Sequence, residues 1–170
     1  ISIPDVTQRW KIPLVKPLHI NEAIKEAVDR NPSSSPGLPY VYEGITNKKD
    51  VNPLRVKSFV HNLKYNVNKR IHTPCMAAQI PVVSPDKPKS RLVWVYPANV
   101  SFAESMFAIP LIEAYIKQRG TYAGWINYAA GDMHYINCLG KHYLGLDFER
   151  FDSTVPSWLI SRAFEILRSN

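Results

Sequence analysis

The stretch "YLGLDFERFDSTVP", residues 143–156, contains a short apolar run that ends at Asp147, followed five positions later by Asp152. The run predicts a strand over 141–148, with Asp147 on the face opposite the leucines. Asp152 follows a short turn and is expected beside the same end of the sheet. Two neighbouring carboxylates repel each other, and this repulsion either raises the pKa of one carboxyl group or favours the binding of a cation. Mg²⁺ is a suitable cation because it binds oxygen ligands. In the alternative interpretation Asp152 caps the following helix or turn and Asp147 is solvated.

A second feature is the basic stretch "KPKSRLVWVYP", residues 87–97. Lys89 and Arg91 are two positions apart in a predicted strand, so they share one face. Two cations on one face can clamp a triphosphate, with the arginine offering paired contacts. The apolar residues 92–94 are expected to anchor this strand against a core. The alternative is a solvated basic turn.

A third feature is the loop "SSSPGLPY", residues 33–40. Ser35, Gly37 and Pro39 supply a hydroxyl, a residue free in its backbone dihedrals and a stiff residue. Such a loop can place backbone N–H groups and a hydroxyl against a nucleic-acid phosphate. The same composition is also typical of an ordinary turn.

Composition limits the class of protein. Hydrophobic residues make up 45%, which indicates a globular chain, while the net charge of +7 and the pI of about 9.4 favour a polyanionic partner. Cys75 and Cys138 lack the spacing of a metal site and are expected to be buried free thiols in a reducing compartment. No apolar run approaches the ~18 residues of a membrane span. We therefore expect a soluble, cytoplasmic protein with no membrane partner.

The order of elements predicts an α+β fold, or part of a larger mixed fold. The first 20 residues are expected to be extended. Helices are predicted at 20–31 with Asn21 as N-cap, 52–70, 101–120 with a kink at Pro110 and Gly120 as C-cap, 131–140, and after Pro156; strands are predicted at 77–83, 90–97 and 141–148. The cations of the helix at 52–70 form either an RNA-facing surface or a solvated face.

Taken in this order, the three stretches resemble one family, the RNA-dependent RNA polymerases of double-stranded RNA viruses, most closely the partitivirus type. "LDFERFDSTVP" resembles the first palm motif, D-x4-D followed by a small hydroxyl residue. "KPKSRLVWVYPANVSFAESMFAIPL" resembles the K-x-R fingers motif, and "SPGLPY" is similar to the fingers loop that guides the template. The resemblance covers residues 30–165.

The resemblance implies roles for the residues of the palm motif. Asp147 would hold the catalytic Mg²⁺ (or Mn²⁺) ions, shared with an aspartate motif that is missing from this chain. Asp152 would face the ribose of the incoming nucleotide and help to read its 2′-hydroxyl.

The resemblance also implies roles for the fingers. Lys89 and Arg91 would neutralise the triphosphate of the ribonucleoside triphosphate as charge builds on its oxygens. Ser35, Gly37 and Pro39 would contact the template strand. RNA template and product are the implied partners, a viral capsid protein is a further candidate, and the implied location is the cytoplasm or the interior of the virion.

The implied architecture is a partial right-hand polymerase fold. Residues 1–30 would form an N-terminal extended segment and helix, 31–141 a fingers-like region, and 142–170 the start of the palm. The sequence has neither the second palm motif nor a Gly-Asp-Asp turn, and its single "GD" at Gly131 precedes Asp147. We therefore expect a fragment without the palm remainder and thumb, which is inactive alone.

Two other functions stay open. One is a non-catalytic RNA-binding module or an endogenised viral remnant, which would bind RNA in a salt-sensitive way without Mg²⁺. The other is a hydrolase that uses Asp147 and Asp152 as acid and base. The hydrolase leaves the K-x-R strand unexplained.

Overall fold

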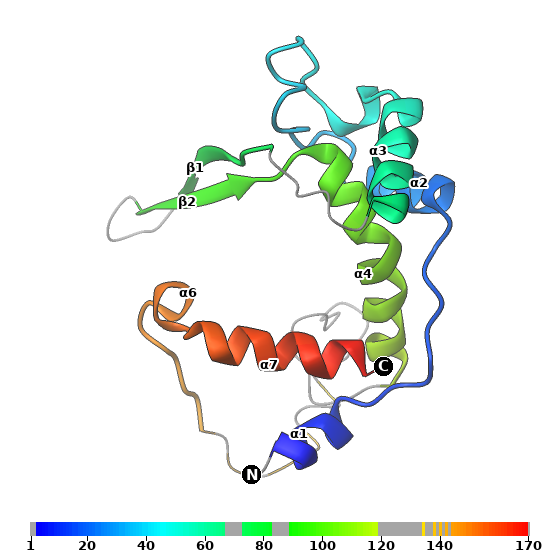
Figure 1. Cartoon of the computed structure of the whole chain (residues 1–170). Coiled ribbons are helices and arrows are strands. Elements are labelled where there is room, and N and C mark those ends of the chain that lie inside the picture. The colour runs from blue at the N-terminus through cyan, green and yellow to red at the C-terminus, as the bar shows by residue number, and fades with distance from the viewer. Residues whose placement is uncertain are drawn as a thin grey trace. The chain divides into compact units, whose positions relative to one another are not determined.

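The computed structural model describes residues 3–66, 73–82, 89–118, 134, 138, 140, 142 and 144–169, without the side chains of Ile3, Arg9, Val82 and Lys89. Its elements are α1 (Ile3–Arg9), α2 (Ile20–Arg30), the short 3₁₀ helix η1 (Lys48–Asp50), α3 (Pro53–Tyr65), β1 (Met76–Val82), β2 (Lys89–Val95), α4 (Ala98–Gln118), α6 (Phe151–Thr154) and α7 (Ser157–Arg168) (Figure 1). Helices and a small sheet together are compatible with the predicted α+β class.

The chain divides into two compact units, each described by itself. One unit is Lys16–Pro110, and the other combines Ile1–Val15 with Leu111–Asn170. The predicted boundaries at 30 and 141 stay predictions.

Two helices of the unit Lys16–Pro110 follow the predicted pattern, with one correction. Asn52 caps α3 by accepting the Leu54 N–H at 2.9 Å, and Pro53 stands at the first helical position. Helix α2 starts at the buried Ile20, one residue before the predicted cap, so the prediction of Asn21 as N-cap was wrong. The cap is His19, whose Nδ1 accepts the Asn21 N–H at 3.2 Å. The helix predicted at 52–70 ends at Tyr65, with Asn66 as its C-cap, and residues 67–70 lie outside the described residues.

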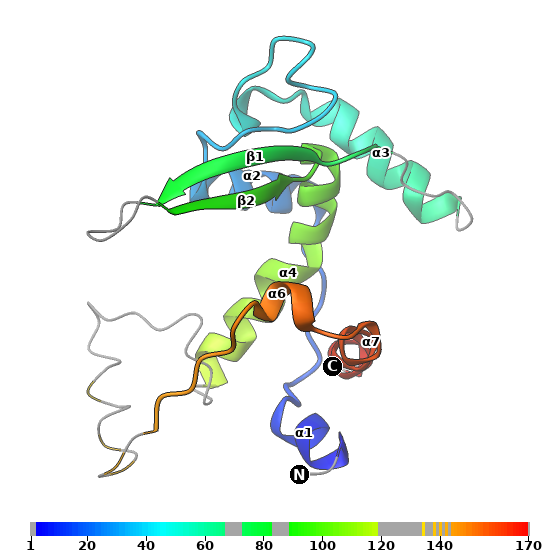
Figure 2. The same ribbon diagram turned by 90° about the vertical axis from the view of Figure 1, so that its left-hand side faces the viewer.

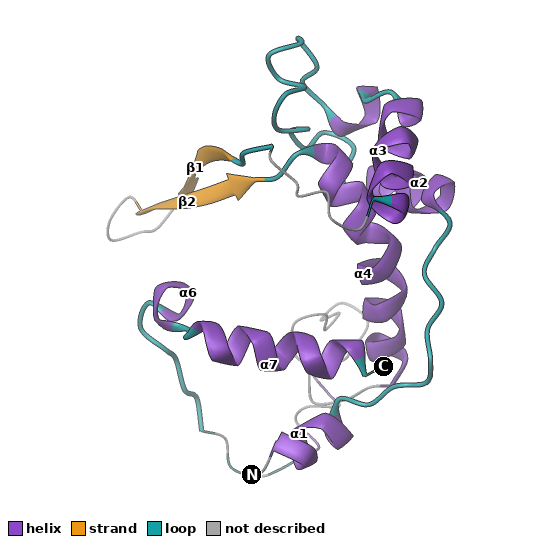
Figure 3. Cartoon of the chain, viewed as in Figure 1, coloured by secondary structure: helices purple, strands orange, loops and turns teal. Residues whose placement is uncertain are grey.

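The predicted pair of strands is confirmed as an antiparallel hairpin (Figures 2 and 3). Its register pairs Met76 with Val95 at one end and Val82 with Lys89 at the other. The connecting turn, with Lys87, lies outside the described residues. The expected anchoring of residues 92–94 was wrong in part, because Leu92 is 64% and Trp94 59% exposed. Within the described residues the sheet has two strands. Leu92 and Trp94 lie on its exposed face, whereas Val93, on the opposite face, is half-buried.

The core of this unit joins the loop at residues 31–47 to three helices. Helix α4 begins at Ala98, three residues before the predicted start, and contains Pro110. The buried cluster consists of Ile20, Tyr40, Val51, Val56, Ala98 and Phe102. Burial of these side chains is the main stabilising term for the loop and helices around them.

The other unit departs from the predictions at its N-terminal segment. Residues 3–9 form α1, although an extended segment was predicted. Proline is tolerated in the first helical turn, and Asp5 there is favourable beside the positive end of the helix dipole. Trp10 then packs edge to face on Tyr115 at 5.3 Å, and the Tyr115 hydroxyl donates to the Trp10 carbonyl at 2.9 Å.

The predicted strand at 141–148 is not present over residues 144–148, which adopt no regular structure. A strand needs a neighbour for its ladder, and the two strands in the described part of the chain pair with each other. The final helix is confirmed as α7, and its Trp158, Leu159, Ile160 and Phe164 are exposed.

Further predictions concern residues 119–143, the two cysteines and membrane spans. The predicted helix at 131–140 and the cap at Gly120 fall largely outside the described residues. Cys138 is exposed and Cys75 is half-buried, so the prediction of buried thiols was wrong for Cys138 and only partly met for Cys75; both thiols are free. No helix in the described ranges combines the length and the apolar character that a membrane crossing requires.

Candidate nucleotide and template site

The loop with the S-x-G-x-P pattern has a defined conformation. Gly37 is buried with φ +65°, in the left-handed region that favours glycine, and its N–H donates to Ser35 Oγ at 3.3 Å. The Leu38–Pro39 peptide bond is cis. A Cβ added to Gly37 would lie 2.7 Å from the carbonyl oxygen of Tyr96. Glycine is therefore required here by both the dihedral and the space.

The same contact brings two of the predicted site stretches together. The Pro36 carbonyl accepts the Ala98 N–H at 2.8 Å, so the loop is fixed at the connection between β2 and α4. On its other side the Ser34 carbonyl accepts the Lys48 N–H at 2.9 Å. Ser35 and Pro39 keep part of their surface in solvent. Gly37 thus shapes the loop, and Ser35 and Pro39 are the members of the pattern that are accessible from solvent.

An ion pair holds the far side of the loop to α3. Arg55 Nη2 donates to Glu43 Oε1 at 2.9 Å and Nη1 donates to Oε2, a paired contact of the strong kind. The guanidinium also lies 4.7 Å from the centroid of the buried Tyr40 ring. The hydrogen bond from Arg55 holds the pKa of Glu43 below its usual range, and burial raises the pKa of Tyr40.

The sequence alone did not reveal this ion pair. It placed Arg55 among the cations of a basic helix face, whereas the structure pairs the guanidinium with Glu43, twelve positions earlier. No helical or strand period connects these positions, because an irregular loop lies between them. The signal in the sequence was limited to opposite charges on either side of the loop.

Lys48 is a second cation of the loop region that sequence reasoning did not single out. It is half-buried in η1, and burial lowers the pKa of its ammonium group, opposed by the charge of Glu104 on α4.

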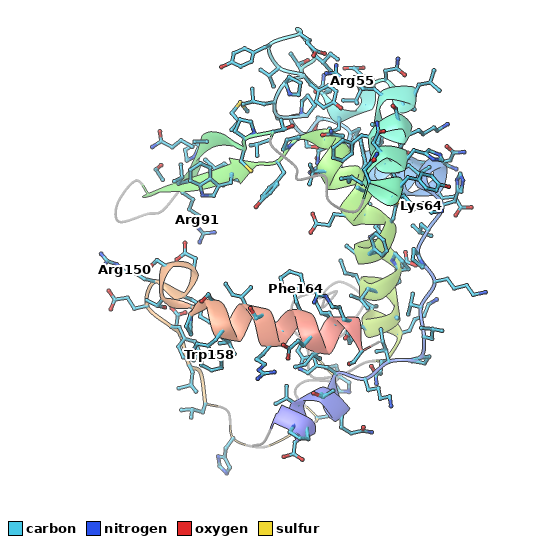
Figure 4. All side chains as sticks on the ribbon, viewed as in Figure 1. Arg55, Lys64, Arg91, Arg150, Trp158 and Phe164 are labelled. Carbon is cyan, nitrogen blue, oxygen red and sulfur yellow. The ribbon has the colours of Figure 1, made fainter. Side chains whose placement is uncertain are left out.

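The K-x-R stretch occupies β2 as predicted. Arg91 is exposed, pairs with Ile80 across the hairpin and projects from the strand in Figure 4. Lys89 pairs with Val82 at the end of the same strand, and its side chain lies outside the described residues. Positions two apart in a strand share one face, so the backbone supports the predicted pair.

The two aspartates belong to the other unit. Asp147 is exposed in the irregular segment 144–148, and Asp152 is exposed in the first turn of α6. Asp152 caps neither α6, whose N-cap is Arg150, nor α7, whose N-cap is Pro156, so the capping interpretation was wrong for both helices.

Arg150 shapes the turn between the two aspartates. It is left-handed, with φ 52° and ψ 41°, a conformation that costs a non-glycine residue about 1 kcal/mol. Its carbonyl accepts the hydroxyls of Ser153 and Thr154 at 3.1 and 3.0 Å. The hydroxyl residues of the motif therefore stabilise its turn.

The aspartates do not make a complete metal site. Nowhere in the described part of the chain do three or more His, Cys, Asp or Glu side chains gather as metal ligands would. Asp147 offers the carboxylate oxygens that Mg²⁺ prefers, but one exposed carboxylate does not hold the ion by itself. A complete site needs further oxygen ligands.

Comparison with known proteins supplies the class. The family model of viral RNA-dependent RNA polymerases matches residues 14–170, nearly the whole chain. The chain belongs to the viral RNA-dependent RNA polymerase family. Neither the curated proteins nor the solved structures gave a match.

Proposed function

We propose that this chain forms the fingers and the first palm motif of a longer RNA-directed RNA polymerase of a double-stranded RNA virus, of the partitivirus type. The observation that carries the proposal is the hydrogen bond from Ala98 to the Pro36 carbonyl. It fixes the template loop to the end of the K-x-R strand, within one compact unit of a chain that belongs to the polymerase family.

In this proposal the fingers bind both substrates. Ser35 and Pro39 contact the template RNA, and the Arg55–Glu43 ion pair holds their loop on α3. Arg91 and Lys89 bind the triphosphate of the incoming nucleotide, where paired donors on a rigid strand stabilise the charge that grows during transfer. Because β2 and the loop share the Tyr96–Ala98 connection, template and nucleotide are aligned by one piece of backbone.

The palm motif supplies the remaining groups. Asp152 accepts a hydrogen bond from the ribose 2′-hydroxyl, which distinguishes ribonucleotides from deoxyribonucleotides. Asp147 would be one ligand of the divalent metal that such polymerases use, and the bound metal would supply activation of the 3′-hydroxyl and stabilisation of the leaving pyrophosphate. The second metal carboxylate belongs to a Gly-Asp-Asp motif that this sequence does not contain. In this proposal the 170 residues alone are inactive. The proposed location of the complete enzyme is the cytoplasm or the virion, and a capsid protein is a further candidate partner.

The test compares two acidic residues in the complete polymerase. Asp147→Asn removes a metal ligand and should lower nucleotide incorporation on an RNA template by at least about 1,000-fold. Glu149→Gln removes the same charge two positions away, from another exposed side chain, and should leave incorporation unchanged. Synthesis by the Asp147 variant at the normal rate would refute the proposal.

A sequencing experiment tests the length of the protein. An open reading frame that continues beyond the codon of Asn170 to a serine-glycine motif and then Gly-Asp-Asp is the expected result. A stop codon or a decayed frame there would favour an RNA-binding remnant instead.

A further inference from the structure

Helix α3 carries basic residues and no acidic ones, and apart from Arg55 the proposed site does not use them. Its sequence contains Arg55, Lys57, Lys64 and His61 and no carboxylate. Exposed helix faces usually combine both signs in pairs three or four positions apart, and α2 does so with Glu26 and Arg30.

Helical geometry separates Arg55 from the other basic residues of α3. At ~100° per residue, positions 57, 61, 64 and 65 fall within a stripe about 100° wide, and position 55 lies outside it. Arg55 is neutralised by Glu43, and neither Lys57 nor Lys64 has an ion pair within the described residues. Figure 4 shows Arg55 and Lys64 at different levels of the helix. We call Lys57, His61, Lys64 and Tyr65 the α3 stripe.

The α3 stripe also presents aromatic rings to solvent. The His61 and Tyr65 rings are stacked, with centroids 6.0 Å apart and planes at 16°. The Lys64 ammonium lies 5.6 Å from the Tyr65 centroid, and Tyr65 is 71% exposed. A flat exposed ring beside a cation can stack a nucleobase while the cation binds the adjoining phosphate.

We infer that the α3 stripe is a binding surface for single-stranded RNA, outside the nucleotide and template site. Lys57 and Lys64 are two turns apart, about 10 Å along the axis, and bind phosphates on either side of a base stacked on Tyr65. The His61 ring, stacked with the Tyr65 ring, helps to hold Tyr65 in place. The inference rests on the proposed function for the identity of its ligand, because a polymerase must handle single strands beyond its reaction centre.

The apolar surface of α3 argues against a membrane as the partner. Val56 is fully buried and Val60 packs against the same core, so these apolar side chains are covered, and Leu54, which is 70% exposed, is a single aliphatic side chain beside the stripe. The stripe itself contributes charge and rings but no row of aliphatic side chains of the kind that inserts at a lipid interface.

The experiment measures RNA binding by the complete polymerase. The probe is a fluorescein-labelled mixed-sequence single-stranded RNA of about 12 nucleotides, and its anisotropy gives Kd over a series of KCl concentrations. In Lys57→Ala/Lys64→Ala the slope of log K against log salt should become shallower by about 1.4, since each phosphate contact to a single strand contributes about 0.7. The control Lys25→Ala/Lys49→Ala removes the same charge from exposed positions on α2 and η1 and should keep the slope.

Two variants of Tyr65 test the stacking role. Tyr65→Ala should weaken RNA binding by about tenfold with the salt slope unchanged, and Tyr65→Phe should restore it because the ring is kept. A purely structural role is distinguished by this restoration together with an unchanged unfolding midpoint, as expected for an exposed side chain.

The inference would be overturned by a salt slope in the double variant equal to that of the control. It would also be overturned if the double variant kept RNA binding and lost only binding to vesicles of mixed neutral and anionic lipid. Both results come from measurements of binding, whereas the proposed function is tested by nucleotide incorporation in the Asp147→Asn variant. Failure of one is therefore distinguishable from failure of the other.

Discussion

Gly37 lies against the backbone of Tyr96 so closely that a Cβ built on Gly37 would be 2.7 Å from the Tyr96 carbonyl oxygen. Real Cβ atoms do not approach a carbonyl oxygen at this distance, and the neighbour is backbone, which cannot rotate away. The contact fixes the spacing between the loop at residues 31–47 and the end of β2. It makes the spacing between the loop and β2 depend on the absence of one side chain.

Gly37→Ala should therefore lower the free energy of unfolding by roughly 2–4 kcal/mol, from the left-handed dihedral and the clash together. Gly44→Ala is a matched control, because Gly44 also has positive φ, at +82°, but nothing lies within 4 Å of its added Cβ. Urea unfolding of the two variants separates the contact from the dihedral. Equal losses for both variants would show that the approach to Tyr96 has no energetic consequence.

The sequence predicted the elements whose signals are local. Asn52 followed by Pro53 predicted the start of α3, and two β-rich runs separated by a Pro-containing turn predicted the hairpin. The strand at 141–148 was wrong over the described residues 144–148, because a strand depends on a partner elsewhere in the chain. Helix α1 was missed because three prolines suggested an extended segment, although Pro4 stands in the first helical turn, where proline is tolerated.

For the candidate site, the sequence predicted the protein family but not the tertiary contacts that hold the loop. The order of the S-x-G-x-P, K-x-R and D-x4-D stretches led to the polymerase family, which the family match confirms. The contacts that hold the loop were not predictable, because Glu43 with Arg55 and Pro36 with Ala98 meet through tertiary packing of irregular backbone. No period in the sequence encodes such a meeting.

The Arg55–Glu43 ion pair should make stability depend on pH in the acidic range. Because the pKa of Glu43 is lowered in the folded protein, its stabilising effect is present above the unfolded pKa of about 4.3 and is lost as pH falls through the lower folded pKa. The stability difference between the wild type and Glu43→Gln should therefore shrink as pH falls through this window. Urea unfolding from neutral to acidic pH measures it.

Arg55→Met provides the control for this dependence. It keeps an apolar stem against Tyr40 but removes the guanidinium that lowers the pKa of Glu43. In the Arg55→Met background, Glu43→Gln should lose its acidic dependence. A dependence that survives unchanged would assign the effect to another group.

Lys48 should make stability depend on pH in the alkaline range, because its charged form is disfavoured by folding. Burial lowers its folded pKa, so the charged ammonium destabilises the fold at neutral pH, and stability recovers as pH rises from the folded pKa towards the unfolded value of about 10.4. Lys48→Met removes the charge and keeps the stem, so it should be stabilising at neutral pH. The gain should stay below about 1 kcal/mol because the side chain is only partly buried and water screens its charge.

Unfolding at neutral and alkaline pH checks the effect of Lys48→Met, whose advantage over the wild type should diminish as pH rises. The matched variant Lys49→Met changes an exposed neighbour in the same 3₁₀ helix and should show no such gain. A loss of stability in Lys48→Met would mean that attraction to Glu104 outweighs the burial of the ammonium.

Arg91 should determine how well the complete polymerase uses nucleoside triphosphates. Arg91→Ala removes a paired donor from an exposed position on β2 and should lower kcat/KM for the nucleotide by about 100-fold, with little change in the Kd for template RNA. Arg91→Lys should recover part of this loss, because the lysine ammonium restores the positive charge but not the paired hydrogen bonds of the guanidinium. Arg30→Ala, which removes an exposed arginine of α2 in the same unit, serves as the control for charge. If Arg91→Ala instead weakened template binding and left nucleotide use intact, the K-x-R strand would be a template surface rather than a triphosphate clamp.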